Sequence, residues 1–178
     1  MADMPELREF EVVSPAPKAA ALREQFQSPE SVVAAMYDLL SGPAESERER
    51  DWDRFKGLAL PSARWLICHG WDADGNKTPG LREWDTEGFV ADARKAYQFS
   101  GFWEQEIWGR TERFGNIAHR FSTYESRVGS KESEPVGRGI NSVQLAWADG
   151  RWWIASVVWD SESPVQPIPS RYEQSQDG

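Results

Sequence analysis

The chain has 178 residues, a formal net charge of -9, two histidines and one cysteine. This length suits one domain with a proper core. The acidic balance excludes the basic surface that nucleic acids and anionic membranes require, and a lone cysteine, Cys68, excludes an internal disulfide and a cysteine-based zinc cluster.

The chain shows no signal for export or membrane insertion. Its first residues lack a charged segment followed by an apolar run, and no stretch of about 18 apolar residues occurs. We therefore expect a cytoplasmic protein with neither a membrane nor a nucleic acid as its partner.

The N-terminal part predicts an extension and then two helices. Residues 1–27 mix charges, alanines and prolines without a sustained apolar period, which indicates an N-terminal extension. Ser28 can cap a helix and Pro29 suits its first turn. A shorter helix is expected around Trp52 and Phe55. The first helix carries apolar residues at helical spacing, namely Val32, Val33, Met36, Leu39 and Leu40.

The segment that follows resembles a calcium-binding loop in its spacing of oxygen-bearing side chains. However, the position that needs glycine is Lys77, and a non-glycine residue forced to positive φ there costs about 1–2 kcal/mol. The flanks, residues 64–69 and 81–84, have the pattern of strands and not of helices. We therefore predict no metal site and a long hairpin connection. The matching side chains are Asp72, Asp74, Asn76, Thr78 and Glu83.

A third helix and four strands are predicted next. The helix opens at Asp85 or Thr86, and residues 100–101 end it. Two hairpins follow, with turns at 115–116 and 149–150; the Asp-Gly turn is the strongest hairpin signal in the chain. Residues 162–178 are rich in proline and are expected to form a C-terminal tail. The predicted strands span residues 102–113, 117–127, 139–148 and 151–161.

The last hairpin should present two different faces. A two-residue turn at 149–150 fixes the register, because paired residues then have numbers that sum to 299. One face is then apolar near the turn and polar at its far end, as in a half-open pocket, or simply where the sheet meets solvent. The opposite face would expose several apolar side chains, so we predict a homodimer through the outer face of the sheet. The pocket face carries Trp147, Trp152, Leu145, Ile154, Val143, Ser156, Asn141 and Asp160; the outer face carries Trp153, Trp159, Ile140 and Val157.

The order of these elements resembles the nuclear transport factor 2-like superfamily, in particular its SnoaL-like branch. The resemblance rests on SPESVV (28–33), RFGNIAH (113–119), FSTYE (121–125) and DGRWWI (149–154) with Trp159-Asp160, and it covers residues 28–161. It implies an α+β fold, with a cone-like curved antiparallel sheet and three helices packed on its concave face.

The same resemblance implies a range of functions. The superfamily contains isomerases, dehydratases, epoxide hydrolases and polyketide cyclases, together with non-catalytic binding proteins. Its enzymes typically use an Asp or His base in the cone, with Tyr, Asn or Trp as polarising donors. No stretch of this chain matches the active-site motif of one family, so each role must be argued from the residues.

Asp160 is the first candidate for a catalytic base. Within an apolar cone, desolvation would raise its pKa toward a range useful for removing a proton beside a carbonyl. Asn141 and Tyr37 are candidate donors to the developing oxyanion, and Ser156 and Trp152 complete the predicted substrate-binding set.

His119 is a second catalytic candidate, although a lone histidine among apolar neighbours is more often a hydrogen-bonded core residue. Cys68 and His69 point to opposite faces of a strand and cannot act together. The acidic residues Glu104, Glu106 and Glu125 are interpreted as a solvated surface, interleaved with Arg110 and Arg127.

Two functions remain open. The first is a small-molecule-binding protein with an apolar pocket, acting as a cofactor-free acid/base isomerase, dehydratase or cyclase. The second is a non-catalytic dimerisation or binding module of the same fold. A buried carboxylate with a shifted pKa would favour the first, and a side-chain-filled cone would favour the second.

Overall fold

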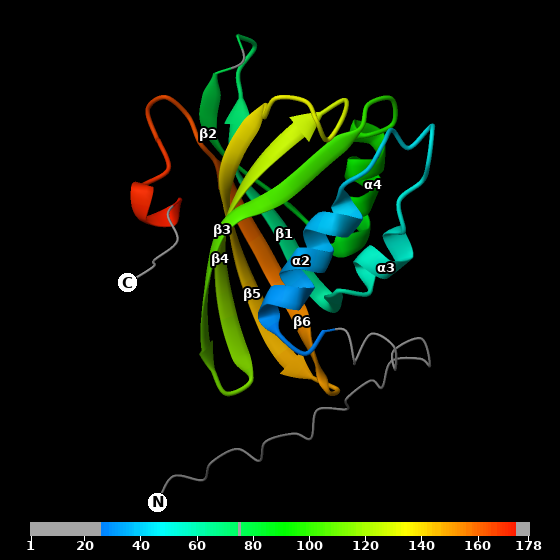
Figure 1. Cartoon of the computed structure of the whole chain (residues 1–178), viewed down its shortest axis with the longest axis vertical. Helices are drawn as coiled ribbons and strands as arrows, with labels where there is room; N and C mark the ends of the chain where they lie inside the picture. The colour runs from blue at the N-terminus through cyan, green and yellow to red at the C-terminus, as the bar shows by residue number, and fades with distance from the viewer. Residues whose placement is uncertain (1–25, 75, 174–178) are drawn as a thin grey trace, which may run out of the picture.

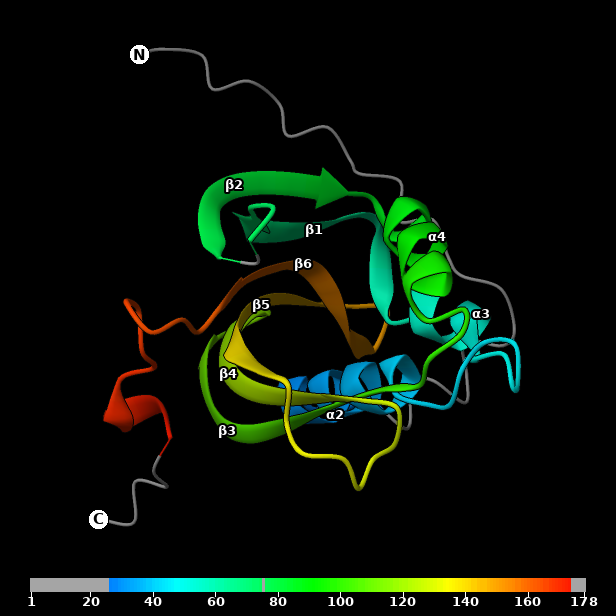
Figure 2. The ribbon, with the colours of Figure 1, turned by 90° about the horizontal axis from the view of Figure 1, so that it is seen from above.

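The computed structural model describes residues 26–74 and 76–173. In this part of the chain, three α-helices pack on the concave face of a curved, open six-stranded sheet, which confirms the predicted α+β cone (Figures 1 and 2). The helices are α2 (Pro29–Leu40), α3 (Trp52–Lys56) and α4 (Thr86–Ala96). The strands, in the order β2-β1-β6-β5-β4-β3, are β1 (Ala59–Trp71), β2 (Lys77–Trp84), β3 (Phe102–Phe114), β4 (Ile117–Val128), β5 (Gly137–Ala148) and β6 (Arg151–Ser161).

All neighbouring strands are antiparallel except β1 and β6, which run parallel. Strands β3 to β6 form a meander, and both predicted hairpins are present. Asp149 and Gly150 have φ values of 53° and 77°, as a tight hairpin turn with matching twist requires. The turn residues therefore determine how the strands pair within the two hairpins.

The helices begin where their capping residues predict. The Ser28 hydroxyl accepts a hydrogen bond from the Ser31 amide at 3.1 Å, and Asp85 accepts one from Gly88 at 2.7 Å. Helix α2 buries its predicted apolar stripe against β3, β4 and β6. This packing places one side chain of α2, Tyr37, over the middle of the sheet.

The connection between β1 and β2 is shorter than predicted. Strand β2 begins at Lys77, which pairs with Trp71, so only residues 72–76 join the two strands. The Asp72 carboxylate accepts hydrogen bonds from the amides of Asp74 and Asn76, so it organises the turn. The prediction of a long loop was wrong because Pro79 is tolerated on this edge strand.

A bulge in β6 changes the register predicted for the last hairpin. Pairing follows the predicted sum from the turn to Leu145 and Ile154, and then shifts by one residue at Ala155. Beyond the bulge, Asn141 pairs with Trp159 instead of Val158. Because one inserted residue exchanges the two faces of a strand, the part of β6 after the bulge is turned over relative to the prediction.

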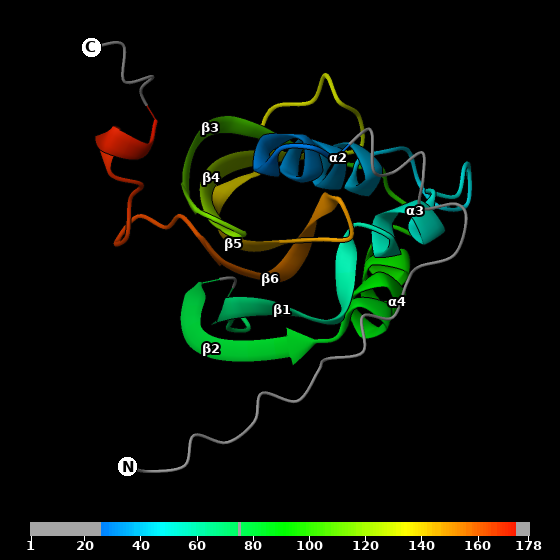
Figure 3. The ribbon, with the colours of Figure 1, turned by 90° about the horizontal axis from the view of Figure 1, so that it is seen from below.

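Near the start of the described chain Phe26 joins the core, whereas the segment after β6 lies on the outer face of the sheet. Most of the predicted N-terminal extension, residues 1–25, lies outside the described residues, while Phe26 is fully buried and its carbonyl accepts a hydrogen bond from the Trp152 amide. Residues 162–173 run along the outer side of the sheet (Figure 3). There the ring of Tyr172 packs on Trp108 and Phe121. No described helix is long and apolar enough to span a membrane.

Candidate active site

A cavity of about 210 Å³ lies between the helices and the concave face of the sheet. Six aromatic side chains, three aliphatic ones and three polar ones form its wall. The enclosure combines a mostly apolar surface with few polar groups, as small-molecule sites do. The lining residues are Trp65, Phe89, Tyr97, Phe102, Tyr124 and Trp159; Met36, Leu40 and Val157; and Glu104, Ser126 and Asn141.

A larger hollow of about 360 Å³ lies between α3 and α4 on the surface. Its wall is dominated by charged side chains, including Glu49, Asp53, Lys56 and Arg94, of which several pair with one another. The one buried charged side chain among its described lining residues, Arg50, is already bound to Glu45, so we place the candidate site in the smaller, aromatic cavity.

Glu104 is the acidic group of the aromatic cavity. Strand β3 turns it inward together with Phe102, and its carboxylate accepts a hydrogen bond from the Asn141 amide nitrogen at 3.4 Å. Burial raises the pKa of Glu104 to about 7, and the Asn141 hydrogen bond opposes this rise only in part. Glu104 therefore changes its ionisation near neutral pH, as a general acid or base must.

A chain of hydrogen bonds runs from Asn141 into the protein. The Asn141 amide donates to the Tyr37 hydroxyl at 3.0 Å, and Tyr37 and Ser122 share a hydrogen bond of 2.7 Å. Ser122 in turn donates to Glu106 at 2.5 Å. Tyr37, Ser122 and Asn141 are all buried, so these bonds hold the Asn141 amide rigidly beside the Glu104 carboxylate.

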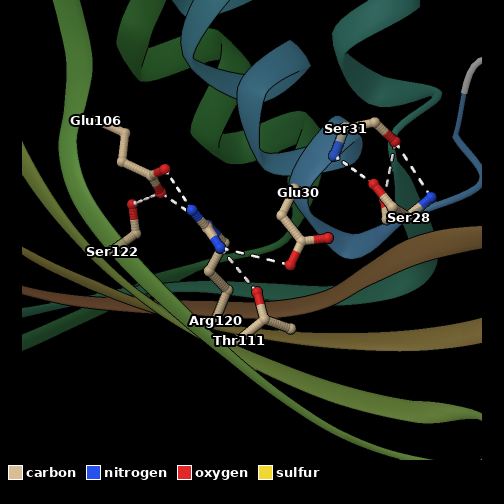
Figure 4. A network of polar contacts seen from close by, with 7 residues as sticks. All are labelled: Ser28, Glu30, Ser31, Glu106, Thr111, Arg120 and Ser122. Carbon is tan, nitrogen blue, oxygen red and sulfur yellow. Dashed lines mark hydrogen bonds and ion pairs between the residues drawn. The ribbon is translucent and has the colours of Figure 1, made fainter. Parts of the chain in front are cut away.

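This chain ends in an ion pair. Arg120 Nε donates to Glu106 Oε2 at 2.8 Å, and Arg120 also contacts Thr111 at 2.7 Å and Glu30 at 3.6 Å (Figure 4). The hydrogen bond from Arg120 to Glu106 raises the pKa of the guanidinium. Glu106 thus has the cationic partner that Glu104 lacks.

A second chain of contacts leads from the cavity wall to Asp160. The Tyr124 and Ser161 hydroxyls lie 3.2 Å apart, Ser161 lies 3.3 Å from His69 Nε2, and His69 Nδ1 lies 3.2 Å from Asp160. Lys77 approaches the same carboxylate at 2.6 Å. Burial raises the pKa of Asp160, but hydrogen bonds from Lys77 and Gln166 outweigh it and lower the pKa overall.

The structure brings together only part of the predicted site. Asn141 lines the cavity, and the Tyr37 hydroxyl accepts a hydrogen bond from the Asn141 amide. Asp160 and Ser156 do not line it, because the bulge at Ala155 turns both to the other face of β6. Their predicted position inside the cone was therefore wrong.

The two remaining candidates also lie away from the cavity. Trp152 is fully buried in the core, where it packs edge-on against Trp147. His119 lies on the outer side of β4 and shares a hydrogen bond of 2.9 Å with Ser142. The catalytic roles of Asp160 and His119 stay predictions.

Sequence reasoning missed the principal acidic residue. Glu104 and Glu106 face the interior, so their interpretation as a solvated surface was wrong, whereas Glu125 does pair with Arg127 outside the cavity. The opposite face of β3 also carries an apolar side chain, that of Trp103, so the alternation along this strand does not by itself indicate which face points inward. The one local signal that Glu104 points inward is its position two residues after Phe102, because residues two apart on a strand share a face.

No family model and no curated protein sequence matches the chain. Solved structures do match. The β subunit of benzoate 1,2-dioxygenase from Burkholderia mallei has a TM-score of 0.52 and 10% identity, covering 80% of this chain and 93% of that one. A Nostoc punctiforme protein of unknown function with a cystatin-like fold has a TM-score of 0.52 and 9% identity, covering 76% and 89%. At such identities the likeness shows the fold alone, which is the nuclear transport factor 2-like fold.

Proposed function

We propose that this protein binds a small, largely apolar molecule in the aromatic cavity and exchanges a proton with it through Glu104. The chemistry would be that of a cofactor-free isomerase, dehydratase or cyclase of the SnoaL-like kind. One observation carries the proposal: a carboxyl group with a pKa of about 7 faces a mostly apolar cavity.

The proposed reaction begins with proton removal. Ionised Glu104 takes a proton from the carbon beside a ligand carbonyl; the electrons of that C–H bond form a C=C bond, and the π electrons of the C=O bond move onto oxygen, which gives an enolate. The Tyr124 hydroxyl, on the cavity wall, is the candidate donor to that oxygen. Protonated Glu104 then returns the proton to the same or another carbon, so that no cofactor is consumed.

Deuterium exchange tests this proposal without knowledge of the natural substrate. In D₂O, the wild-type protein should exchange the α-protons of 4,4-dimethylcyclohexanone faster than buffer does, as followed by mass spectrometry. Glu104→Gln should exchange these protons at least about 100-fold more slowly than the wild type, because a general base typically contributes at least that factor to the rate.

The variant Asp160→Asn tests whether Asp160, and not Glu104, is the base. If exchange depends on Asp160 and survives in Glu104→Gln, Asp160 is the base and the assignment to Glu104 fails. If the wild type gives no exchange above buffer with this ketone or with larger cyclic ketones, the acid/base function is refuted.

The alternative function is a non-catalytic binding or dimerisation module. Exposed apolar side chains on the outer face of the sheet are the reason to test it. Ile107 and Ile117 of the β3–β4 hairpin are 38% and 63% exposed, although Tyr172 covers neighbouring Phe121. A homodimer through this face remains our proposal, as does a cytoplasmic location. Sedimentation of a monomer at micromolar concentration would remove the dimer.

A further inference from the structure

The charge inside the aromatic cavity lacks a counter-ion. Several other half-buried carboxylates of the described chain have a basic partner: Glu106 contacts Arg120, Glu45 contacts Arg50 at 2.6 Å and Asp160 contacts Lys77 at 2.6 Å. In the described part of the chain, Glu104 makes no ion pair; its side chain accepts one long hydrogen bond, from Asn141. A buried carboxylate in this situation carries a large desolvation cost whenever it is ionised.

The cavity wall offers nothing to neutralise that charge. No lysine, arginine or histidine is among the described residues that line the cavity. Arg50 lies over the ring of Tyr97, 4.8 Å from its centre, but is not part of the wall. Its guanidinium is bound to Glu45 and to the carbonyls of Leu40 and Gly42, so its charge and donors are already engaged.

The rest of the wall suits a cation with an apolar body. Six aromatic rings supply contact area, and wherever a ring face meets a cationic group it attracts that group electrostatically. An anionic ligand would face the Glu104 carboxylate with no compensating positive charge, and is disfavoured by like-charge repulsion. A neutral ligand would leave the ionised carboxylate without a partner.

We propose that the ligand of this cavity is an organic cation, a protonated amine or a quaternary ammonium group on a compact apolar body, with its nitrogen held against Glu104. This inference rests on the proposed function, because it names the ligand class of the same cavity. The volume of about 210 Å³ is below the roughly 300–1,000 Å³ of drug-sized sites, which limits the body to about one ring.

A pair of ligands that differ only in charge tests the inference. The cation 1,1-dimethyl-4-oxopiperidinium and the neutral ketone 4,4-dimethylcyclohexanone have the same shape, since a quaternary nitrogen replaces a quaternary carbon. Calorimetric titration of the full chain at about pH 8, where Glu104 is mostly ionised, should show the cation binding at least about tenfold more tightly.

Two variants assign the preference to one residue. Glu104→Gln should remove the cation preference, so that the two probes bind with similar affinity. Glu112→Gln removes an equal charge from an exposed site on the same strand β3, where Glu112 is 67% exposed, and should keep the preference. Loss of the preference in both variants would show general attraction by the acidic surface and would overturn the inference.

The pH dependence of the wild type gives a test that needs no variant. Between about pH 5.5 and pH 8, cation affinity should rise at least tenfold as Glu104 ionises, while affinity for the ketone stays flat or falls. The tyrosines that face Glu104 do not titrate in this window, because burial raises the pKa values of Tyr37, Tyr97 and Tyr124 above their ordinary value. The Arg50 guanidinium nearby is bound to Glu45. A flat profile for the cation would overturn the inference.

Failure of the inference is distinguishable from failure of the proposed function. If the ketone binds as well as the cation or better, the cavity is a binding site but not one for organic cations. If neither probe binds at millimolar concentration, both the ligand class and the proposed binding function fail for ligands of this size.

Discussion

Replacing Glu104 with glutamine should stabilise the protein in a strongly pH-dependent way. The substitution keeps the shape of the side chain and removes its ability to ionise. Because burial raises the pKa of Glu104 to about 7 from an ordinary 4.5, ionisation inside the cavity is less favourable than in the unfolded chain.

The sign follows from proton binding. Between about pH 4.5 and pH 7 the folded state holds the Glu104 proton while the unfolded state releases it, so the wild type loses stability as pH rises. The difference between the two pKa values corresponds to about 3 kcal/mol, reached above pH 7 and absent below pH 4.5. Glu104→Gln should therefore be about 3 kcal/mol more stable than the wild type at pH 8, and nearly equal to it at pH 4.

Urea denaturation followed by tryptophan fluorescence at several pH values measures this difference. Glu112→Gln is the matched control, because its carboxylate is exposed and the substitution should change stability by less than about 0.5 kcal/mol at every pH. A stability difference for Glu104→Gln that stays constant from pH 4 to pH 8, or that favours the wild type at pH 8, would refute the reasoning.

Two further substitutions probe the polar network behind the cavity. Tyr37→Phe removes the hydroxyl between Asn141 and Ser122 and should cost about 1–3 kcal/mol in urea denaturation at neutral pH, because buried polar groups lose their partner; an unchanged midpoint would contradict this. Arg120→Leu leaves Glu106 half-buried without its cation and should cost about 3–5 kcal/mol. The double variant Arg120→Leu/Glu106→Leu should recover part of that loss, and strictly additive losses would show that the two side chains are not coupled.

Local sequence signals predicted most of the fold. The caps at Ser28 and Asp85 and the turn at Asp149-Gly150 act within a few residues of chain, so their effects can be predicted without knowledge of the rest of the molecule. The alternation of β4 likewise predicted that Phe121 and Thr123 share a face with His119. Asn141 was expected in the site because it lies at the polar end of one hairpin face, and Tyr37 was expected as a second donor from the first helix.

The candidate site was predicted only in part, since its acidic residue depends on contacts between distant segments. The bulge at Ala155 has no signature in the residues around it, yet it turns Asp160 out of the cone and Trp159 into it. Strand β3 carries side chains of both kinds on each face, so its pattern alone did not indicate that Glu104 points inward.

The sequence by itself determined the helices and the hairpins, because capping, turn chemistry and apolar periodicity are properties of short segments, and the resemblance in their order to a known superfamily implied the α+β cone. Only the tertiary structure decided which carboxylate faces the cavity and which is neutralised. The position of a charge relative to aromatic walls and cationic partners depends on strand register and on which segments meet across the sheet. For that reason Glu104 faces the cavity while Asp160 lies outside it and pairs with Lys77, the reverse of the positions expected from the sequence.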